Sequence, residues 1–522
     1  MKPIRLISGF LTVGVWTLLS RVLGFVRDVL IAGFLGAGPV AEAFLIAFAL
    51  PNMFRRFFAE GAFNMAFVPM FSKKLEKGDD PVSFARDAFA GLSLILIILT
   101  VLAHLFMPYL VLMMASGFAA DERLDLAVYL GRITFVYILF ISLAALTSGV
   151  LNASGRFAAA AAAPVLLNII LIGAVWIGAQ GCKCTEGEEQ LWIGVHMAWG
   201  VAIAGVAQLA LVWWAAHRAG FTLTPRLPRL TPEMKKLTII AAPAMLAGGV
   251  MQINLLVGRQ VASFYDGAIA WLSYADRLYQ LPLGVVAIAL GVVLLPDLSR
   301  RLAAGDHEGG RDAFNRASEL ALALTIPAAV ALVVIPLPLV GVLFERGAFD
   351  SDDTAATALA VTVYGLGLPA FVLQKALQPL YFAREDTKRP FYFAAVAMVV
   401  NAIVAIGLSI YIGYIAAAVA TTLAGWVMVW LLYRGSRDMG DAARFDDRFK
   451  SRLWRIILAS ALMGGVLMLG VLLVGPALGL AGVRYAALAF IVLLGMGSYF
   501  GLGQLLGAFR LSEFKAAVRR GS

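Results

Sequence analysis

The sequence is poor in charged residues, cysteine and histidine. Charged residues make up 14% of its 522 positions, whereas soluble domains carry about 25%. Two cysteines exclude a disulfide scaffold, and the four histidines show no HExxH or similar spacing that would indicate a zinc site. In contrast, 61% of the residues are apolar and the mean hydropathy is +0.87. This composition excludes an ordinary soluble protein and predicts a polytopic membrane protein.

The apolar residues are gathered into long runs. A bilayer core of roughly 30 Å needs about 20 apolar residues per helix. We therefore expect an all-α membrane protein with about 14 transmembrane helices, of which the first two and the eighth carry charges. The expected spans are 8–34, 41–70, 86–115, 126–151, 160–180, 191–216, 237–262, 269–298, 314–336, 356–382, 390–411, 414–433, 453–475 and 484–508.

The basic residues are distributed unevenly between the two sides of these spans. Both ends of the chain and the loops after even-numbered spans hold thirty of the 42 Lys and Arg residues. By the positive-inside rule, both termini are expected in the cytoplasm. This topology explains the net charge of +10 and argues against nucleic acid as a partner. The opposite loops hold only Arg123, Lys183, Arg346 and Arg484.

The loops leave little room for other functions. The longest connections, near 217–236 and 434–452, are too short for a nucleotide-binding domain, and no GxxxxGK[ST] motif occurs. The first span lacks a signal-peptide cleavage pattern, so we expect it to be retained. Any transport would therefore draw on gradients, on membrane potential or on substrate supply.

An internal repeat relates two parts of the chain. When Arg27 is aligned with Arg259, Pro51 follows at a distance of twenty-four residues and Pro282 at twenty-three. The repeat spacing of six helices predicts a parallel repeat. We therefore expect two pseudo-symmetric six-helix lobes and two added helices, although a chance match remains the alternative. The expected parts are 1–217, 236–434 and 453–508.

Eight basic residues fall inside the expected spans. A charge at bilayer depth costs at least about 2.5–3.5 kcal/mol, so such residues should face protein or a water-filled cavity. Snorkelling to the membrane surface explains three of them, Arg132, Arg259 and Lys375, equally well. The other five are Arg21, Arg27, Arg55, Arg56 and Arg277.

Four carboxylates accompany these five arginines. They are Asp28, Glu42, Glu60 and Asp276. Arg21 and Asp28 share a helix face, and Arg56 and Glu60 form an i,i+4 pair. Because guanidinium groups bind phosphate and carboxylate oxygens in a bidentate way, the excess of arginine predicts an anionic ligand. A buried salt-bridge network between helices is the structural alternative.

Four stretches of sequence resemble a known family. SRVLGFVRD at 20–28, FLGAGPVAEAF at 34–44, LPNMFRRFFAEGAFNMAFVPMFS at 50–72 and SYADRL at 273–278 are similar to the signature of the MurJ (MviN) family. Its members are bacterial lipid II flippases of the multidrug/oligosaccharidyl-lipid/polysaccharide exporter superfamily. The resemblance covers essentially the whole chain.

The resemblance implies a function and a site. It implies a transporter in the bacterial inner membrane that moves the undecaprenyl-pyrophosphate-linked peptidoglycan precursor, lipid II, to the outer leaflet by alternating access. It also implies that the two last helices form a groove for the lipid tail. A monomer surrounded by membrane lipids is expected, with cell-wall synthesis proteins as further partners. The expected substrate-binding residues are Arg21, Arg27, Asp28, Glu42, Arg55, Arg56, Glu60 and Arg277.

One departure from the family concerns sodium. Some members bind sodium through acidic residues on the seventh and eleventh spans, but 237–262 and 390–411 contain no Asp or Glu here. The neutral oxygens of Asn254, Asn401, Thr421 and Thr422 would bind sodium only weakly. A sodium site is therefore doubtful, no cofactor is expected, and membrane potential is a sufficient driving force in principle.

Other interpretations remain as alternatives. An exporter of drugs or of another oligosaccharide-lipid is the nearest, and a membrane enzyme acting on polyprenyl phosphates is the next. Only the acidic run Asp350, Asp352 and Asp353 hints at an enzyme's metal ligands, and solvated loop charges explain it better. Cys182 and Cys184 are too close for an unstrained disulfide and are expected to be incidental thiols.

Overall fold

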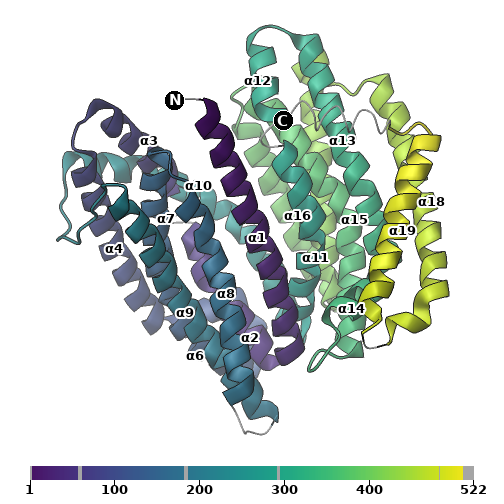
Figure 1. Ribbon diagram of the computed structural model, residues 1–522, viewed down its shortest axis with the longest axis horizontal. Coiled ribbons are helices and arrows are strands. Elements are labelled where there is room, and N and C mark those ends of the chain that lie inside the picture. Colours follow the sequence, from purple (N-terminus) through teal and green to yellow (C-terminus); the bar gives the residue numbers. More distant parts are fainter. Residues whose placement is uncertain (1–2, 57–61, 182–185, 291–293, 481, 510–522) are drawn as a thin grey trace. The chain divides into compact units, whose positions relative to one another are not determined.

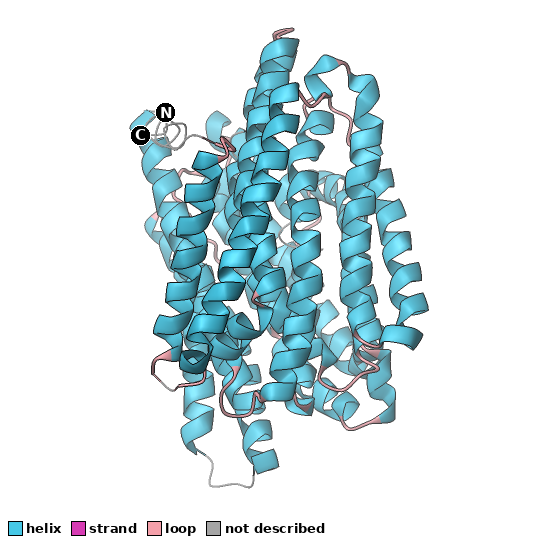
Figure 2. Cartoon of the chain, turned by 90° about the vertical axis from the view of Figure 1, so that its right-hand side faces the viewer, coloured by secondary structure: helices cyan, strands magenta, loops and turns pink. Residues whose placement is uncertain are grey.

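The fold is helical throughout the part of the chain that the structure describes. The computed structural model describes residues 3–56, 62–181, 186–290, 294–480 and 482–509 (Figure 1). Within these ranges the chain forms nineteen α-helices and a few short 3₁₀ helices, joined by turns and short loops (Figure 2). The expected all-α fold is confirmed.

The chain divides into two compact units. Unit 1 comprises Met1–Ala270 and Arg346–Phe349, and unit 2 comprises Trp271–Glu345 and Asp350–Ser522. The helices of unit 1 are α1 (Pro3–Leu35), α2 (Pro39–Arg55), α3 (Ala62–Lys77), α4 (Pro81–Leu105), α5 (Met107–Met114), η2 (Ser116–Ala120), α6 (Arg123–Phe135), α7 (Tyr137–Ala153), α8 (Ala158–Gly181), α9 (Glu186–Arg218) and α10 (Pro232–Ala262).

Unit 2 begins near the start of α11 and includes the C-terminal helices. In it, α13 packs against α15 and α18, and α18 packs against α19. Its helices are α11 (Ala268–Ala289), α12 (Leu295–Ala303), α13 (His307–Val334), α14 (Pro336–Phe344), α15 (Ser351–Phe382), α16 (Lys388–Ile412), α17 (Ile415–Ser436), η4 (Arg437–Met439), η5 (Asp441–Ala443), α18 (Asp447–Leu478) and α19 (Arg484–Leu505).

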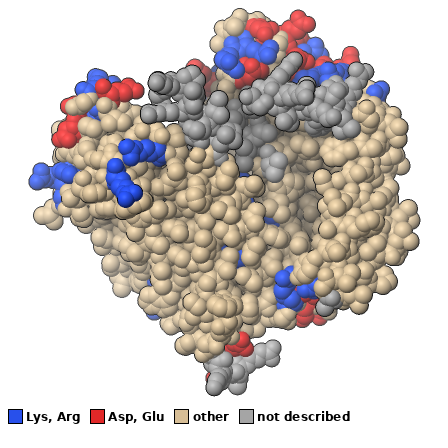
Figure 3. Space-filling model, viewed as in Figure 1, with Lys and Arg blue, Asp and Glu red and all other residues tan. Residues whose placement is uncertain are grey.

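Ten helical segments among the described residues are long and apolar enough to cross a membrane. They coincide with ten of the fourteen expected spans, and the segment Arg123–Ala153 joins α6 and α7 into one of them. Most of the described surface seen in Figure 3 is uncharged, and the Lys, Arg, Asp and Glu side chains gather in a few patches on it. The chain is a multi-pass membrane protein, whereas the number fourteen stays a prediction.

Two expected spans are each divided into two helices among the described residues. The expected span 86–115 holds α4 and α5, and 126–151 holds α6 and α7. Pro108 lies in the first turn of α5, where its missing N–H is tolerated. Pro51 and Pro282, by contrast, lie inside α2 and α11, and both helices continue past them. Hydropathy detected these spans, but it did not show the breaks within them.

Helix α10 packs within unit 1. It contacts α3, α4 and α5, and the carboxylate of Glu233 in its first turn pairs with Lys74 of α3 at 2.9 Å. The sequence repeat assigns this helix to the second lobe. The two units are defined by which helices lie close together, whereas the lobes are defined by the sequence repeat. The two six-helix lobes therefore stay a prediction.

Aspartate and threonine side chains begin several helices. Asp350 Oδ1 accepts hydrogen bonds from the backbone N–H groups of Asp352 and Asp353, both at 2.9 Å, and so caps α15. Asp353 in turn accepts a hydrogen bond from the Trp271 indole at 2.7 Å. The acidic run at 350–353 was expected to be solvated loop charge, but it lies at the start of α15 and has a structural task there.

Candidate functional site

Arg27 is a buried arginine on α1. Its side chain lies among α1, α8 and Phe48 of α2, and the whole residue is only 8% exposed. Its Nε and one terminal nitrogen donate to Asp28 Oδ1 at 2.9 and 2.7 Å, and the other terminal nitrogen donates to Asn168 Oδ1 at 2.9 Å. We call Arg27, Asp28 and Asn168 the Arg27 group.

The local fold fixes the Arg27 group. Helices α1 and α8 pack together, and a Cβ on Gly24 would lie 3.6 Å from the Asn168 amide. The Asn168 amide nitrogen also donates to the carbonyl oxygen of Ser20 at 2.9 Å. The Asn168 side chain is thus held on α1 by its amide nitrogen, and its amide oxygen is oriented to accept the hydrogen bond from Arg27.

The other predicted arginines of unit 1 lie in different environments. Arg21 is exposed on α1, six residues and therefore about 9 Å of helix before Arg27. Arg55 is half-buried at the end of α2, and the next residue, Arg56, is exposed. Glu60, the expected partner of Arg56, lies outside the described residues. The shared helix face predicted that Asp28 pairs with Arg21, whereas Asp28 Oδ1 accepts two hydrogen bonds from Arg27.

Glu42 belongs to a separate cluster at the start of α2. It is 1% exposed, and its Oε2 accepts a hydrogen bond from Arg123 at 2.7 Å. Its Oε1 accepts the backbone N–H of Ile269, in the first turn of α11, at 2.9 Å. Glu42 thus joins the start of one helix to the start of another. We call Glu42, Asp121, Arg123, Asp266 and Ile269 the Glu42 junction.

Arg123 is the centre of the Glu42 junction. Besides Glu42, its guanidinium group contacts Asp121 at 2.6 Å and Asp266 at 3.0 Å, and it lies 4.6 Å from the centre of the Phe118 ring. The hydrogen bonds from Arg123 hold the pKa of Asp121, in the loop before α6, below its usual value of 3.8. Arg123 was expected to be a loop charge, but it is only 4% exposed.

Two backbone contacts lie beside the Glu42 junction. The N–H of Gly117 donates to Ser263 Oγ at 2.9 Å, and Gln260 Oε1 accepts hydrogen bonds from the N–H and hydroxyl of Ser116 at 2.8 and 2.7 Å. A Cβ on Gly117 would collide with the carbonyl oxygen of Ser263. The turn after α10 therefore packs directly on η2.

Residues 346–349 dock on the turn between α1 and α2. The N–H of Ala348 donates to the carbonyl oxygen of Gly33 at 2.9 Å. Gly36 has a positive φ of 60°, and a Cβ there would collide with the Ala348 carbonyl oxygen. A glycine is therefore required at position 36 both by its backbone conformation and by this close approach.

The remaining predicted arginine, Arg277, lies in unit 2. It is half-buried on α11, next to Asp276, whose carboxylate accepts a hydrogen bond from the Gln280 amide. One turn away, the Tyr279 ring packs on Tyr364 and Phe371 of α15 at centroid distances of 5.0 and 5.5 Å. Arg277 therefore lies in a polar stretch of α11, beside the aromatic contacts of Tyr279.

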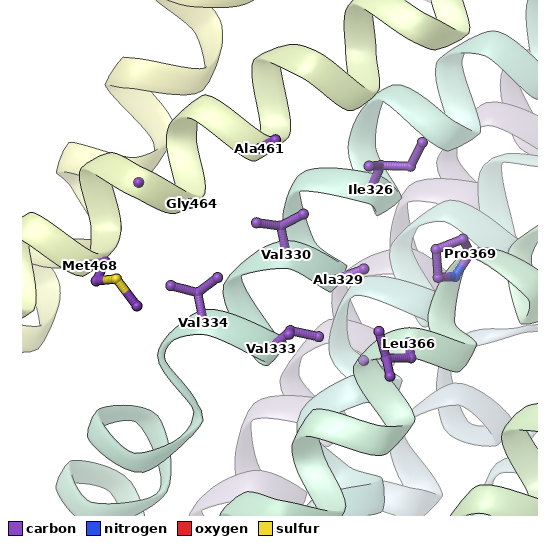
Figure 4. Close-up of a pocket in the computed structure, with 12 residues that line it drawn as sticks. Ile326, Ala329, Val330, Val333, Val334, Leu366, Pro369, Ala461, Gly464 and Met468 are labelled. Atoms are coloured by element: carbon purple, nitrogen blue, oxygen red, sulfur yellow. The ribbon is translucent and has the colours of Figure 1, made fainter.

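Unit 2 also contains an apolar groove. It has a volume of about 480 Å³ and lies between α13, α15 and α18 (Figure 4). Every lining residue is uncharged and none carries a polar side chain. The lining residues are Ile326, Ala329, Val330, Val333, Val334, Gly365, Leu366, Pro369, Ala461, Gly464, Gly465 and Met468.

Two of the neutral oxygens considered for sodium, those of Thr421 and Thr422, have backbone partners. The hydroxyl of Thr421 donates to Ala417 O and that of Thr422 to Val363 O, both at 2.9 Å. Asn401 is buried on α16. Within the described part of the chain, no three His, Cys, Asp or Glu side chains gather as metal ligands. Cys182, Cys184 and the side chain of Asn254 lie outside the described part of the structure.

Sequence reasoning missed Asn168 and Arg123. Asn168 is one of only two polar side chains in the apolar run 160–180, which is a signal for a buried hydrogen-bond partner. Its partner Arg27 is 141 positions away. Arg123 pairs with Glu42 at a separation of 81 residues, so a single sequence held no direct signal for that contact.

Comparisons with known proteins agree on one family. The model of the family described as "Lipid II flippase MurJ" matches residues 31–490. A protein of Rhizobium tropici named "Probable lipid II flippase MurJ" is 41% identical over 522 residues, covering 99% of this chain and 97% of the relative.

Solved structures share the fold. A structure of "Lipid II flippase MurJ, inward closed conformation" superposes with a TM-score of 0.77 at 27% identity, covering 94% of this chain and 98% of that protein. An inward-facing multidrug resistance transporter of the MATE family superposes with a TM-score of 0.65 over 81% of this chain and 95% of its own, but at 16% identity that likeness concerns the fold alone.

Proposed function

The chain belongs to the MurJ family of lipid II flippases, which are membrane transporters and not enzymes, and we propose that it moves lipid II itself across the bacterial inner membrane. The cargo would be the undecaprenyl-pyrophosphate-linked peptidoglycan precursor, carried from the cytoplasmic to the outer leaflet by alternating access. The observation that carries this proposal is the family match over residues 31–490. A polar headgroup cannot cross hydrocarbon unaided, so it needs a sheltered route.

The Arg27 group supports an anionic cargo. Arg27 is buried within α1, and Asp28 occupies two of its nitrogens while Asn168 occupies the third. We propose that the pyrophosphate competes with Asp28 for the guanidinium fork, because a phosphate that accepts two parallel hydrogen bonds is a close geometric substitute for a carboxylate. Arg21, Arg55, Arg56 and Arg277 would hold the remaining negative charges, with Glu42 and Glu60 completing the polar set.

The apolar groove between α13, α15 and α18 supports a hydrocarbon tail. Its lining offers no charge and no side-chain hydrogen bond, and α18 is the first of the two helices added after the expected lobes. Transfer of apolar surface between lipid and such a groove costs little free energy. We propose that the polyprenyl chain lies there while the headgroup crosses.

The topology and the driving force belong to the same proposal. We propose that both termini are cytoplasmic, which places the Glu42 junction at the outer end of unit 1. Membrane potential would supply about 2.3 kcal/mol per charge per 100 mV. A sodium site stays doubtful because the expected sodium-binding spans contain no carboxylate. We expect a monomer that works beside cell-wall synthesis proteins.

A cellular experiment tests the proposed function. Cells depleted of the protein are treated with an externally added enzyme that cleaves only exposed lipid II headgroups. We expect cleavage to stop on depletion, to return with the wild type and with Arg132→Ala, and to remain absent with Arg27→Ala. Arg132 is the matched control because it is an exposed arginine on α6 of the same unit. Undiminished cleavage in depleted cells would refute the proposal and favour another cargo, such as a drug or a different oligosaccharide-lipid.

A further inference from the structure

We propose that Arg123 is a positioning residue that holds the outer end of unit 1 closed and must release its partners before cargo leaves there. This inference rests on the proposed function for its direction, because that proposal places the Glu42 junction on the outer side. It is carried by the contacts of one buried guanidinium group with three carboxylates. Arg123 is not among the residues expected to bind the cargo.

The three carboxylates come from three separate segments of the chain. Glu42 lies in α2, Asp121 lies between η2 and α6, and Asp266 lies in the turn between α10 and α11. Arg123 contacts them at 2.7, 2.6 and 3.0 Å, respectively. One guanidinium group has five N–H donors in a fixed fork, so Arg123, supported by Asp121 two residues before it, can hold α2 and the α10–α11 turn at once.

Burial makes this fastening stronger than a surface ion pair. The Arg123 side chain is 5% exposed and that of Glu42 is 1% exposed, whereas Asp266 is almost fully exposed. The Phe118 ring covers one face of the guanidinium group. Without Arg123, Glu42 would stay buried without its arginine, and three carboxylates would converge and repel each other. Loss of this one side chain should therefore favour separation of the three segments.

The adjoining turn provides an internal reporter of that separation. Ser263 is fully buried, and its Oγ accepts the N–H of Gly117 in η2 at 2.9 Å. The turn that carries Ser263 also carries Asp266, one of the Arg123 partners. A cysteine at position 263 would therefore react with a thiol reagent only when this turn leaves η2.

The test uses a thiol reagent that cannot cross the membrane. Cys182 and Cys184, the only two cysteines in the chain, are replaced by serine, and Ser263→Cys is introduced. Removing one partner of a buried charge pair is strongly destabilising, so with Arg123→Ala we expect outside labelling to become roughly tenfold faster or more. With Arg123→Lys, which keeps the charge but loses the fork, we expect an intermediate rate. With Arg132→Ala, on the same helix, we expect no change.

A second reporter separates opening from unfolding. Ser154 follows α7, at the other end of the membrane segment Arg123–Ala153. Ser154→Cys is labelled from the opposite side in inverted vesicles. We expect Arg123→Ala to leave this rate unchanged or lower it, because only the outer end opens. General unfolding would accelerate labelling at both reporters.

The outcomes separate this inference from the proposed function. Unchanged labelling at position 263 in both Arg123→Ala and Arg123→Lys would overturn the inference, as would equal acceleration at 154. These rates are measured without any cargo, so they do not depend on lipid II transport. Failure of the wild type to expose lipid II headgroups would refute the proposed function while leaving the closure by Arg123 intact.

Discussion

Arg27 and Arg123 are both buried arginines of unit 1, but their partners differ in number and origin. Arg27 bonds one carboxylate, from the next residue, and one neutral amide on α8. Arg123 bonds three carboxylates from three segments. One carboxylate therefore balances the positive charge of Arg27, whereas the three carboxylates around Arg123 exceed its single positive charge.

The difference indicates two separate uses of a buried guanidinium group. An arginine with a single adjacent carboxylate can exchange that partner for an incoming anion at modest cost. An arginine held by several carboxylates gains nothing from a further anion and serves instead to fasten backbone segments. The following experiments test whether Arg27 is a ligand-binding residue and whether the Glu42 end is a structural closure.

The largest expected effect is that of charge reversal at Arg27. Arg27→Glu places a second carboxylate beside Asp28, so an anionic headgroup should be repelled and transport should fall by roughly 100-fold or more. Growth of cells that carry this variant as the only copy is the measurement, with protein amount in the membrane determined in parallel. Arg132→Glu is the control. Normal growth with Arg27→Glu would contradict a ligand-binding role of Arg27 that Arg123 does not share.

Removal of Asn168 should have a smaller effect. Asn168→Ala leaves one Arg27 nitrogen without its acceptor, and hydrogen bonds to charged groups contribute about 1.5–3 kcal/mol to stability. We expect partial loss of transport and a lower free energy of unfolding in detergent. Asn152→Ala, at an exposed position near the end of α7, should leave both unchanged. Equal effects of the two substitutions would mean that Asn168 does not orient Arg27.

Substitution of Gly36 tests a different contact of unit 1, in which residues 346–349 pack on the turn between α1 and α2. Gly36→Ala introduces a side chain at φ +60° and a collision with Ala348, which together should cost about 1–3 kcal/mol or more. Gly78→Ala is the matched control, because Gly78 has φ +69° but a Cβ at that position would have no neighbour within 4 Å. Unfolding in denaturant should show the larger loss for Gly36→Ala. Equal losses would show that the docked residues 346–349 contribute nothing.

The smallest expected effect is a loss of folding stability at acidic pH. Arg123 lowers the folded-state pKa of Asp121 below its unfolded value of 3.8. The contribution of Asp121 to stability is therefore fully present above that unfolded value and is lost as pH falls through the folded pKa. The side chain is about one-third exposed, so we expect a small loss of stability below about pH 4. Asp121→Asn should remove this part of the pH profile, and an unaltered profile would contradict the pairing.

The sequence was sufficient to predict features that depend on the composition of one continuous apolar segment. Ten expected spans recur as membrane-length helices because hydropathy over about 20 residues reports insertion directly. Arg27 was identified for a similar reason, since a charge in an apolar run is costly wherever it lies. The break between α4 and α5, just before Pro108, was not identified, because proline within a membrane helix can be accommodated or can end it.

The contacts that define the candidate sites could not be predicted in the same way. Glu42 was grouped with the anion-binding arginines, but its partner Arg123 had been assigned to a loop on charge distribution alone. Asn168 and Asp266 become informative only when α8 and the α10–α11 turn are placed in space. Such pairings depend on which helices pack together, and that information is not local to any stretch of sequence.

Transport by the purified protein is the most direct test of the proposed use of Arg27. The wild type and Arg27→Ala are reconstituted in vesicles that contain lipid II, and an externally added enzyme cleaves the headgroups that reach the outer leaflet. We predict that the wild type makes the inner-leaflet pool accessible and that Arg27→Ala leaves it protected at equal protein content. Equal accessibility with both proteins would contradict an arginine-dependent passage of the headgroup.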